Sequence, residues 1–473
     1  MLFPTVDYAV FLALSVAVYW LLPHRARLAW LGSVSIFFYA SWRIAYLPLL
    51  LGVIGVGWLA AVAVDRCRDD ASRSRAVIAA ASVLLLGPLM YYKYWPWLGE
   101  MANAVAGWLG AGPVVDATRL PLPVGVSFFS FQVLAYVIDV RRGEAVERNP
   151  WRMMSFICFF PHLVAGPIVR GRELLPTLRE LPRLQSGAVG LGLYRIGLGM
   201  LKKIVFADVL SQGMVDPLFS DPDRFSSLEL LLGLYAYTLQ IYCDFSAYSD
   251  IAVGSAHLFG ITLPENFNRP YKAASVAAFW RRWHMTLSSW VRDYVYFPMG
   301  GARVDRPWKV YRNLMTTMLI LGIWHGASWN FVIYGLMHGS VVCLNRWQRK
   351  RAGLSPDDEP TQGWPWLWRM LVTLNFVVLA RILFRADDLD GAWRYTEGLL
   401  KHTVGMPRFS YTALAVFAVG WAVHYTPDGW ERGLRERFVR GGPLVWALAL
   451  GAVGLACATL GTGEQLSFIY YSF

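Results

Sequence analysis

Long apolar segments alternate with short charged connections along most of this 473-residue chain. A helix that spans a membrane needs about 20 mostly apolar residues. Eleven segments approach or exceed that length, namely residues 4–22, 29–41, 45–65, 76–95, 188–212, 228–260, 309–323, 328–345, 366–385, 411–426 and 442–460. The pattern predicts an all-α, polytopic membrane protein with about eleven transmembrane helices. Segments 29–41 and 309–323 are short, so tilting or partial insertion is expected there.

Two further apolar segments, residues 122–139 and 153–169, are interrupted by proline and glycine. Irregular backbone persists at membrane depth only where protein buries it or where it lines a water-filled cavity. We therefore expect re-entrant or broken segments that form walls of a cavity. No internal repeat and no separate soluble domain is visible, so residues 1–473 are predicted to form a single integral membrane domain.

Basic residues predict the orientation of the chain. Arg25 and Arg27 follow the first apolar segment, and further arginines gather at 66–75 and 141–152. Because Lys and Arg collect on the cytoplasmic side, the N-terminus is expected outside. The N-terminal segment lacks a basic region and a small-residue cleavage site, which predicts a retained first helix. Residues 345–364 are charged and polar and are predicted to be a solvated connector.

Composition supports the membrane class. Hydrophobic residues make up 56% of the chain and charged residues 16%, against about 45–50% and 25% in soluble domains. The 22 tryptophans suit membrane–water interfaces. The net charge of +12 is first a topology signal, and no basic run, zinc-finger spacing or stacking motif predicts nucleic-acid binding. The five cysteines include no CxxC pair, which argues against a disulfide framework and a metal site.

One stretch departs from the apolar pattern, "AFWRRWHMTLSSWVRDYVYFPMGGARVDRP" at residues 278–307. It places His284 among arginines and tryptophans. On a continuous helix, Trp280, His284 and Ser288 would share one face. The stretch therefore combines one titratable side chain with several cations and indoles, a composition that lipid-facing helices avoid.

A second histidine, His325, lies in the deeply apolar "LGIWHGASWNFVIYGLMHG". Ionisable residues inside a membrane are costly and usually face a cavity or a partner. Gly322 and Gly326 flank His325 and would let a backbone or a substrate approach closely. The structural alternative is a histidine that only satisfies a neighbouring carbonyl group.

Two chemical interpretations of these histidines compete. A metal could bind His284 and His325 with Asp244 or Asp293, but no HxxxH or HExxH spacing and no clear third ligand supports it, so no metal is predicted. The other interpretation is general-base catalysis. A neutral imidazole removes a proton from a hydroxyl near pH 7, and burial disfavours the charged form.

Both motifs resemble those of the membrane-bound O-acyltransferases (MBOAT). "FWRRWHMTLSSWVRDYVYFPMGG" and "GIWHGASWNFVIYGLMHG" are similar to the two histidine motifs of the bacterial branch, which includes the membrane subunit of alginate O-acetylation. "LQIYCDFSAYSDIAVG", "LPENFNRPY", "RILFRADD" and "FIYYSF" also resemble segments of that branch. The resemblance implies that His325 is the catalytic histidine and His284 a second active-site histidine. The implied fold is a ring of helices around a thin central region, where a cytoplasmic tunnel meets an outer funnel.

The resemblance also implies the donor, the partner and the location. The donor would be cytoplasmic acetyl-CoA, with no tightly bound cofactor. Arg281, Arg282 and Arg292 could bind its phosphates, since guanidinium groups match phosphate geometry; alternatively they anchor the chain at the lipid interface. The expected function is O-acetylation of an exported, alginate-type polysaccharide from the bacterial inner membrane, through a periplasmic partner of the SGNH-hydrolase type.

Several alternatives stay open. The polymer could instead be cellulose or peptidoglycan, because the chain ends in Tyr471, Ser472 and Phe473 where alginate-type relatives tend to have an aromatic–Gln–Phe element. A transporter or flippase could use a similar cavity, although transporters usually show internal repeats. A non-catalytic scaffold would leave both histidines unexplained.

Overall fold

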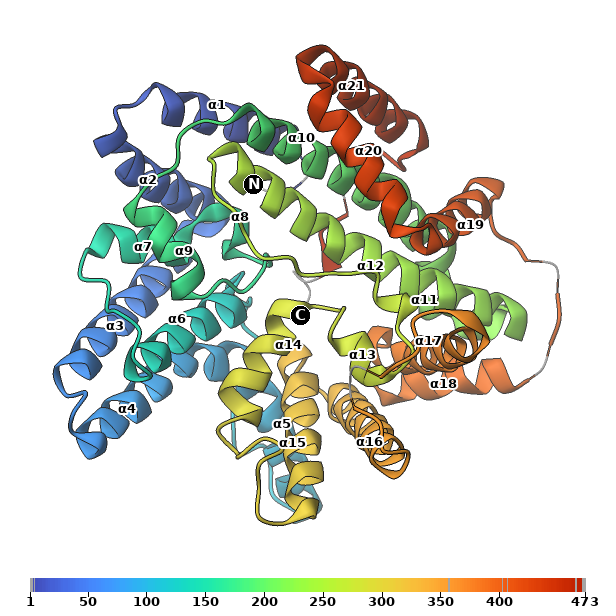
Figure 1. Ribbon diagram of the computed structural model, residues 1–473. Coiled ribbons are helices and arrows are strands. Elements are labelled where there is room, and N and C mark those ends of the chain that lie inside the picture. The colour runs from blue at the N-terminus through green and yellow to red at the C-terminus, as the bar shows by residue number, and fades with distance from the viewer. Residues whose placement is uncertain are drawn as a thin grey trace. The chain divides into compact units, whose positions relative to one another are not determined.

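The computed structural model describes residues 3, 5–355, 358–401, 403–405, 407–463 and 466–469. Within these ranges every regular element is a helix (Figure 1), which confirms the all-α prediction. The chain forms two compact units. Unit 1 comprises residues 1–192 and 252–264, and unit 2 comprises residues 193–251 and 265–473. The prediction of a single domain stays a prediction.

Unit 1 is built mainly from the first nine α-helices. They are α1 (Val6–Leu21), α2 (His24–Arg43), α3 (Leu47–Arg66), α4 (Ala71–Leu89), α5 (Trp95–Trp108), α6 (Val126–Arg141), α7 (Pro150–Cys158), α8 (Phe160–Leu163) and α9 (Gly171–Arg179). Helices α3 and α6 pack closely, because Gly57 of α3 has no Cβ; a Cβ there would lie 1.9 Å from a methyl group of Val133. The long α12 (Ser227–Leu258) ends in this unit.

Unit 2 contains the remaining helices. They are the second half of α10 (Ser186–Met200), the π-helical η3 (Leu201–Asp208) and η4 (Ser211–Val215), α11 (Asp216–Ser220), most of α12, α13 (Val276–Trp280), α14 (Met285–Val291), η7 (Arg292–Tyr296), α15 (Pro307–His325), α16 (Trp329–Arg351), α17 (Gly363–Arg385), α18 (Leu389–Leu400), α19 (Tyr411–Tyr425), α20 (Asp428–Arg440) and α21 (Gly442–Leu460). Two short 3-10 turns, η5 (Pro222–Arg224) and η6 (Pro270–Lys272), join them.

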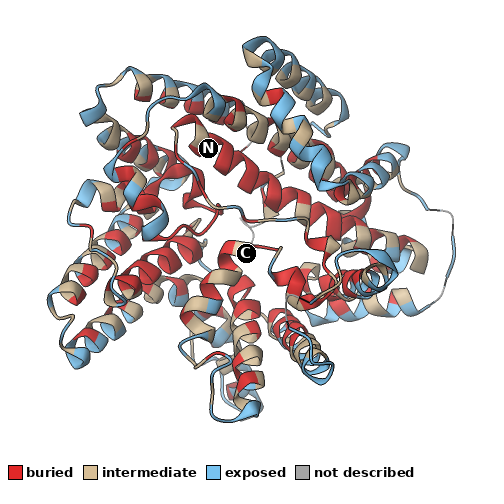
Figure 2. Ribbon diagram, in the orientation of Figure 1, coloured by how far each residue is buried: buried red, intermediate tan, exposed pale blue. Residues whose placement is uncertain are grey.

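Burial divides these helices into interior and peripheral ones. Figure 2 shows α12 buried along most of its length, whereas α21 is exposed or half-exposed throughout. A helix that is apolar all round yet exposed in the protein is typical of a lipid-facing element. Among the residues that the structure describes, four helical segments are long and apolar enough to cross a membrane, 24–66, 71–108, 363–385 and 442–460, and α1 and α19 are shorter apolar helices. The eleven-helix ring, the tunnel and the funnel stay predictions.

The two proline- and glycine-interrupted segments differ in outcome. Residues 153–169 are broken, since α7 ends at Cys158 and α8 covers only Phe160–Leu163. In residues 122–139 the irregular backbone is confined to 122–125, because α6 runs unbroken from Val126 to Arg141, and the re-entrant alternative stays a prediction. Its prolines precede the helix, and Gly125 at the N-cap adopts a left-handed φ of 77° that glycine tolerates. The breaking residues thus terminate the preceding loop and leave the helix intact.

Candidate active site

His284 lies in a tight connection between two short helices of unit 2. Helix α13 ends at Trp280 and α14 begins at Met285, so no continuous helix places Trp280, His284 and Ser288 on one face. His284 itself has φ 43°, in the left-handed region. A non-glycine residue in that region costs of order 1–3 kcal/mol and persists only where its surroundings hold it. The backbone conformation therefore points to a site with specific constraints.

The constraint comes from the 265–268 segment, which runs beside this connection. The backbone N–H of Asn268 donates to the carbonyl of Arg282 at 2.9 Å, and that of Met285 donates to the carbonyl of Asn266 at 2.9 Å. These two bonds bracket His284 from both sides. The Asn266 side chain, buried like His284 itself, contacts the imidazole: its Oδ1 lies 3.1 Å from Nδ1 of His284.

The environment of the His284 ring is largely aromatic. The ring lies edge-on to Phe245 of α12, with centroids 4.8 Å apart, and 5.8 Å from the indole of Trp324 in α15. His284 lies outside the predicted spanning segments, and burial lowers its pKa to about 3. Because the imidazolium is disfavoured, the neutral ring is the form present near pH 7.

His325 is the last residue of α15, where that helix meets α16. Helices α15 and α16 pack side by side (Figure 1). A Cβ on Gly322 would lie 2.4 Å from the carbonyl oxygen of Phe331 and 2.8 Å from Cα of Gly335, so these glycines permit the close packing that the sequence predicted around His325. Gly326 similarly leaves room for the ring of Phe331.

The structure brings His284 and His325 to the same indole. Trp324 lies 5.1 Å from the His325 ring and 5.8 Å from the His284 ring, centroid to centroid. His325 also packs edge-on against Phe384 of α17, at 5.0 Å. Both histidines are buried, with exposed fractions of 0% and 1%. Two residues 41 positions apart (325 − 284) thus belong to one interior cluster of unit 2.

A third buried histidine, His338 of α16, has a different role in this interior. Its Nδ1 accepts a hydrogen bond of 3.2 Å from the indole N–H of Trp280. An indole N–H can only donate, so the lone pair of His338 at Nδ1 is engaged and its proton lies on Nε2. This arrangement is typical of a histidine that satisfies a core donor.

The three arginines predicted to bind phosphate lie at the periphery of the same unit, each with a local contact. Arg281 forms an ion pair of 3.5 Å with Glu359, and Arg292 one of 2.8 Å with Asp293. Arg282 donates to the carbonyl of Asn268 at 3.4 Å. Arg281 and Arg292 are exposed and Arg282 is half-buried. Their role in donor binding stays a prediction.

Sequence reasoning missed Glu359, which lies in the segment predicted to be a solvated connector. Helix α16 continues into that segment as far as Arg351. The carboxylate of Glu359 accepts from Ser275 at 2.6 Å and pairs with Arg349 at 3.0 Å as well as with Arg281. Its side chain is only 12% exposed. The segment is therefore docked on the helix that precedes His284.

A buried cation, Arg381 of α17, was also missed. Its guanidinium lies 4.6 Å from the ring centroid of Trp283 and 5.2 Å from that of Phe384. Phe384 contacts the His325 ring, and Trp283 is the residue that precedes His284 in the chain. The sequence could have identified Arg381, because an arginine within an apolar helix is itself a candidate for a functional or structural role.

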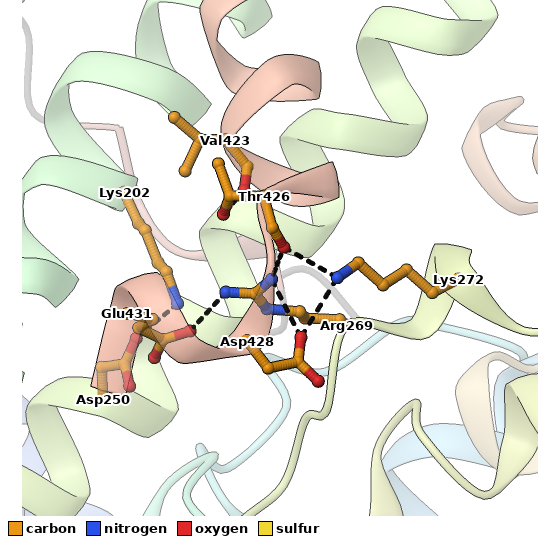
Figure 3. A network of polar contacts seen from close by, with 8 residues as sticks. All are labelled: Lys202, Asp250, Arg269, Lys272, Val423, Thr426, Asp428 and Glu431. Carbon is orange, nitrogen blue, oxygen red and sulfur yellow. Dashed lines mark hydrogen bonds and ion pairs between the residues drawn. The ribbon is translucent and has the colours of Figure 1, made fainter. Parts of the chain in front are cut away.

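A charged network holds the 265–272 segment to the turn between α19 and α20 (Figure 3). Arg269 and Lys272 both donate to the carbonyl of Thr426 and both pair with Asp428, and Arg269 also reaches Glu431 at 2.9 Å. The hydrogen bond from Lys272 holds the pKa of Asp428 below its usual value. These contacts fix the backbone from which Asn266 reaches His284.

Within the described residues no group of three or more His, Cys, Asp or Glu side chains is placed to hold a metal ion. Asp244, one of the ligands considered with the histidines, instead pairs with Lys203 at 2.7 Å. Asp293 pairs with Arg292. The arrangement that the structure does provide is a pair of buried imidazoles beside a peripheral group of arginines, which suits proton transfer next to an anionic substrate.

The residues that form this site lie within a region that matches a known protein family. The model of the MBOAT, membrane-bound O-acyltransferase family, matches residues 115–384, a range that includes both histidines and all three arginines. The chain belongs to this family. It is an O-acyltransferase and a membrane protein, as the resemblance of its motifs implied.

Several MBOAT relatives align over most of the chain. The "Probable alginate O-acetylase AlgI" of Azotobacter vinelandii is 37% identical over 392 residues, which covers 81% of this chain and 75% of the relative. The "Peptidoglycan O-acetyltransferase" of Helicobacter pylori is 34% identical, covering 78% and 73%. The "Probable alginate O-acetylase AlgI" of Pseudomonas aeruginosa is 34% identical, covering 82% and 73%. All three names describe O-acetylation of polymers.

Proposed function

We propose that this MBOAT enzyme is a multi-pass acetyltransferase of the bacterial inner membrane that uses cytoplasmic acetyl-CoA to O-acetylate an exported polysaccharide of the alginate type. The observation that carries the proposal is the pair of buried imidazoles, His284 and His325, which contact one indole within the region matched by the family. The names of the relatives support acetyl as the acyl group and a polymer as the destination.

The proposed reaction is a direct acyl transfer. The oxygen of an acceptor hydroxyl attacks the carbonyl carbon of the acetyl thioester, and the new C–O bond forms as the C–S bond breaks. Neutral His325 takes the hydroxyl proton. The imidazolium then gives this proton to the departing sulfur, so that CoA leaves as its thiol. The developing oxyanion needs a hydrogen-bond donor in a site from which water is excluded. The burial of both histidines is consistent with such a site.

We propose that the donor enters from the cytoplasmic side and that Arg281, Arg282 and Arg292 contact its phosphates. The exposure of Arg281 and Arg292 supports this, because a diphosphate can reach them without desolvating a buried cation. The acceptor on the outer side would be a hydroxyl of a periplasmic partner of the SGNH-hydrolase type, which passes the acetyl group to the sugar. A tunnel and an outer funnel meeting near His325 would connect the two sides.

A second acceptor, peptidoglycan, is favoured by one observation. The peptidoglycan O-acetyltransferase of H. pylori is 34% identical to this chain, the same identity as the AlgI of P. aeruginosa. The transferase chemistry would be unchanged, and only the partner and the polymer would differ.

Reconstituted protein tests the proposal. Proteoliposomes loaded with radiolabelled acetyl-CoA on the cytoplasmic face of the enzyme should transfer label to an acceptor, or release acetate, on the opposite face. Vesicles carrying His325→Ala protein are the matched control. If the wild-type protein transferred nothing from acetyl-CoA but did transfer the acyl group of another donor, the proposal that it transfers acetyl groups would be wrong. Comparing alginate and peptidoglycan fragments with their cognate periplasmic partners separates the two acceptors.

A further inference from the structure

The Asn266 side chain has an orientation that its contacts determine. Its Oδ1 faces three donors or possible donors: the backbone N–H of Thr286 at 3.3 Å, the hydroxyl of Thr286 at 2.9 Å and Nδ1 of His284 at 3.1 Å. A backbone N–H can only donate, so the side-chain atom that faces it must be the carbonyl oxygen. The amide nitrogen, on the other side, lies 3.4 Å from the hydroxyl of Ser249 in α12.

This orientation determines the tautomer of His284. A carbonyl oxygen accepts hydrogen bonds and cannot donate one. Nδ1 of His284 therefore carries a hydrogen and donates it to Asn266. A neutral imidazole has one donor nitrogen and one acceptor nitrogen, so the acceptor of His284 is Nε2. The tautomer is thus fixed by a partner that lies 18 positions earlier in the chain (284 − 266).

His338 shows that this assignment is not imposed by burial in an aromatic interior. There the donor is Trp280, and the proton lies on Nε2. His338 and His284 are equally buried, with exposed fractions of 0% for both. The two rings therefore hold opposite tautomers because one faces an acceptor and the other a donor. Of these two histidines, His284 is the one whose Nε2 is the acceptor, and it contacts Trp324, the indole that also contacts His325.

We infer that Asn266 is a positioning residue, which holds His284 as the Nδ1–H tautomer so that Nε2 accepts a hydrogen bond from the incoming acceptor hydroxyl. The inference rests on the proposed function. It assigns the two histidines different tasks, since His325 removes the proton while His284 orients the hydroxyl. It also excludes neutral His284 as a donor to the developing oxyanion, because the only N–H of its ring is directed at Asn266.

Backbone geometry supports a dedicated role for this contact. His284 adopts its left-handed φ of 43° between the two backbone hydrogen bonds to the 265–268 segment. The ion pairs of Arg269 and Lys272 then hold that segment to the α19–α20 turn (Figure 3). Strain of this kind is stored where a side chain must be presented in a defined direction.

Three variants test the inference. Asn266→Asp keeps an acceptor opposite Nδ1, Asn266→Leu removes it, and Trp280→Phe removes the corresponding hydrogen bond of His338. Protein labelled with ¹⁵N-histidine distinguishes protonated from unprotonated ring nitrogens by NMR, and His284→Gln assigns the His284 signals. Wild-type protein and Asn266→Asp should show Nδ1–H at His284. Asn266→Leu should lose that signature, and its kcat should fall by about 10- to 100-fold, by analogy with the partners that orient metal-bound histidines.

The kinetic pattern separates positioning from folding. Asn266→Leu should leave KM for acetyl-CoA within about threefold, because a positioning defect acts on turnover and leaves donor binding alone. Trp280→Phe should retain wild-type kcat within about threefold, since Trp280 contacts the structural histidine. Asn266→Asp should recover most of the activity lost in Asn266→Leu. If Asn266→Leu does not fold, the wild-type tautomer and the Asn266→Asp protein still decide the matter.

Three results would overturn the inference. They are an Nε2–H tautomer at His284 in wild-type protein, a kcat for Asn266→Leu no lower than that for Trp280→Phe, and a loss of kcat with the His284 tautomer unchanged. Failure of the proposed function would look different. Wild-type protein would then transfer no acetyl group from acetyl-CoA, while the NMR assignment of His284 would be unaffected.

Discussion

His284 and Arg281 are three positions apart in the sequence, yet their surroundings differ completely. His284 is fully buried among Phe245, Trp324 and Asn266. Arg281 is exposed, and the carboxylate with which it pairs sits on a docked loop. Buried polar groups interact strongly because the local dielectric is low, whereas exposed ion pairs contribute little. We therefore expect the interior histidines to govern turnover and the peripheral arginines to govern donor affinity.

The largest effect is expected at His325. His325→Ala should lower kcat by about 10²–10⁴-fold, the usual contribution of a general base, while the protein stays inserted and folded. Acetyl transfer by purified protein measures the loss, and gel filtration in detergent together with thermal unfolding checks the fold. Near-normal transfer by the variant would remove His325 from the mechanism and transfer the role of the base to another group.

A smaller loss is expected for His284→Ala, because the ring orients the hydroxyl and does not remove its proton. We expect a reduction in kcat of about 10- to 100-fold, measured in the same assay. A chelator serves as the companion experiment. Inhibition of wild-type protein by a chelator, reversed by added metal, would favour the alternative in which His284 and His325 bind a metal ion.

The difference between interior and periphery also separates what the sequence could predict from what it could not. His284 and His325 lie in long motifs, and apolar length alone located α12, α15 and α16. The break at His284 was not predictable from helical periodicity, because it depends on backbone hydrogen bonds from the 265–268 segment. Local sequence patterns carry no signal for such partners, since the contact is formed by tertiary packing.

The same limit applies to Asn266 and Glu359. Asn266 lies in "LPENFNRPY", which resembled a family segment, but nothing in that stretch indicates that its amide faces an imidazole. Glu359 lies among Pro, Asp and Gln residues typical of a solvated loop. Its burial depends on Ser275 and Arg349, which come from other elements. Composition indicated a loop at Glu359, and only the three-dimensional contacts show that its carboxylate is docked and that the Asn266 amide faces His284.

At the periphery, the double variant Arg281→Gln/Arg282→Gln should raise KM for acetyl-CoA by about tenfold and leave kcat at saturating donor nearly unchanged. Charge-assisted contacts to phosphate contribute roughly 1.5–3 kcal/mol when fully formed and less when exposed. Arg292→Gln is the matched single variant. Labelling of engineered cysteines at residues 66–75 from each face controls the topology. Labelling from the outer face alone would invert the orientation, and an unchanged KM would make these arginines interface anchors.

The smallest effect is expected from Glu359→Gln, which tests the contact that occupies Arg281. The carboxylate of Glu359 pairs with both Arg281 and Arg349, so a donor phosphate at Arg281 must compete with it. Because the Arg281 side chain is 52% exposed, water screens its ion pair, and such pairs contribute about 0.2–1 kcal/mol. Removing the charge should therefore lower KM for acetyl-CoA by only a few-fold. The glutamine amide oxygen can still accept from Ser275, which preserves the docked loop. In an Arg281→Gln background, Glu359→Gln should no longer lower KM, because the arginine for which Glu359 and the donor phosphate compete is then absent. A lowered KM that persists without Arg281 would instead assign the phosphate contact to Arg349, and a raised KM would show that the docked carboxylate supports donor binding.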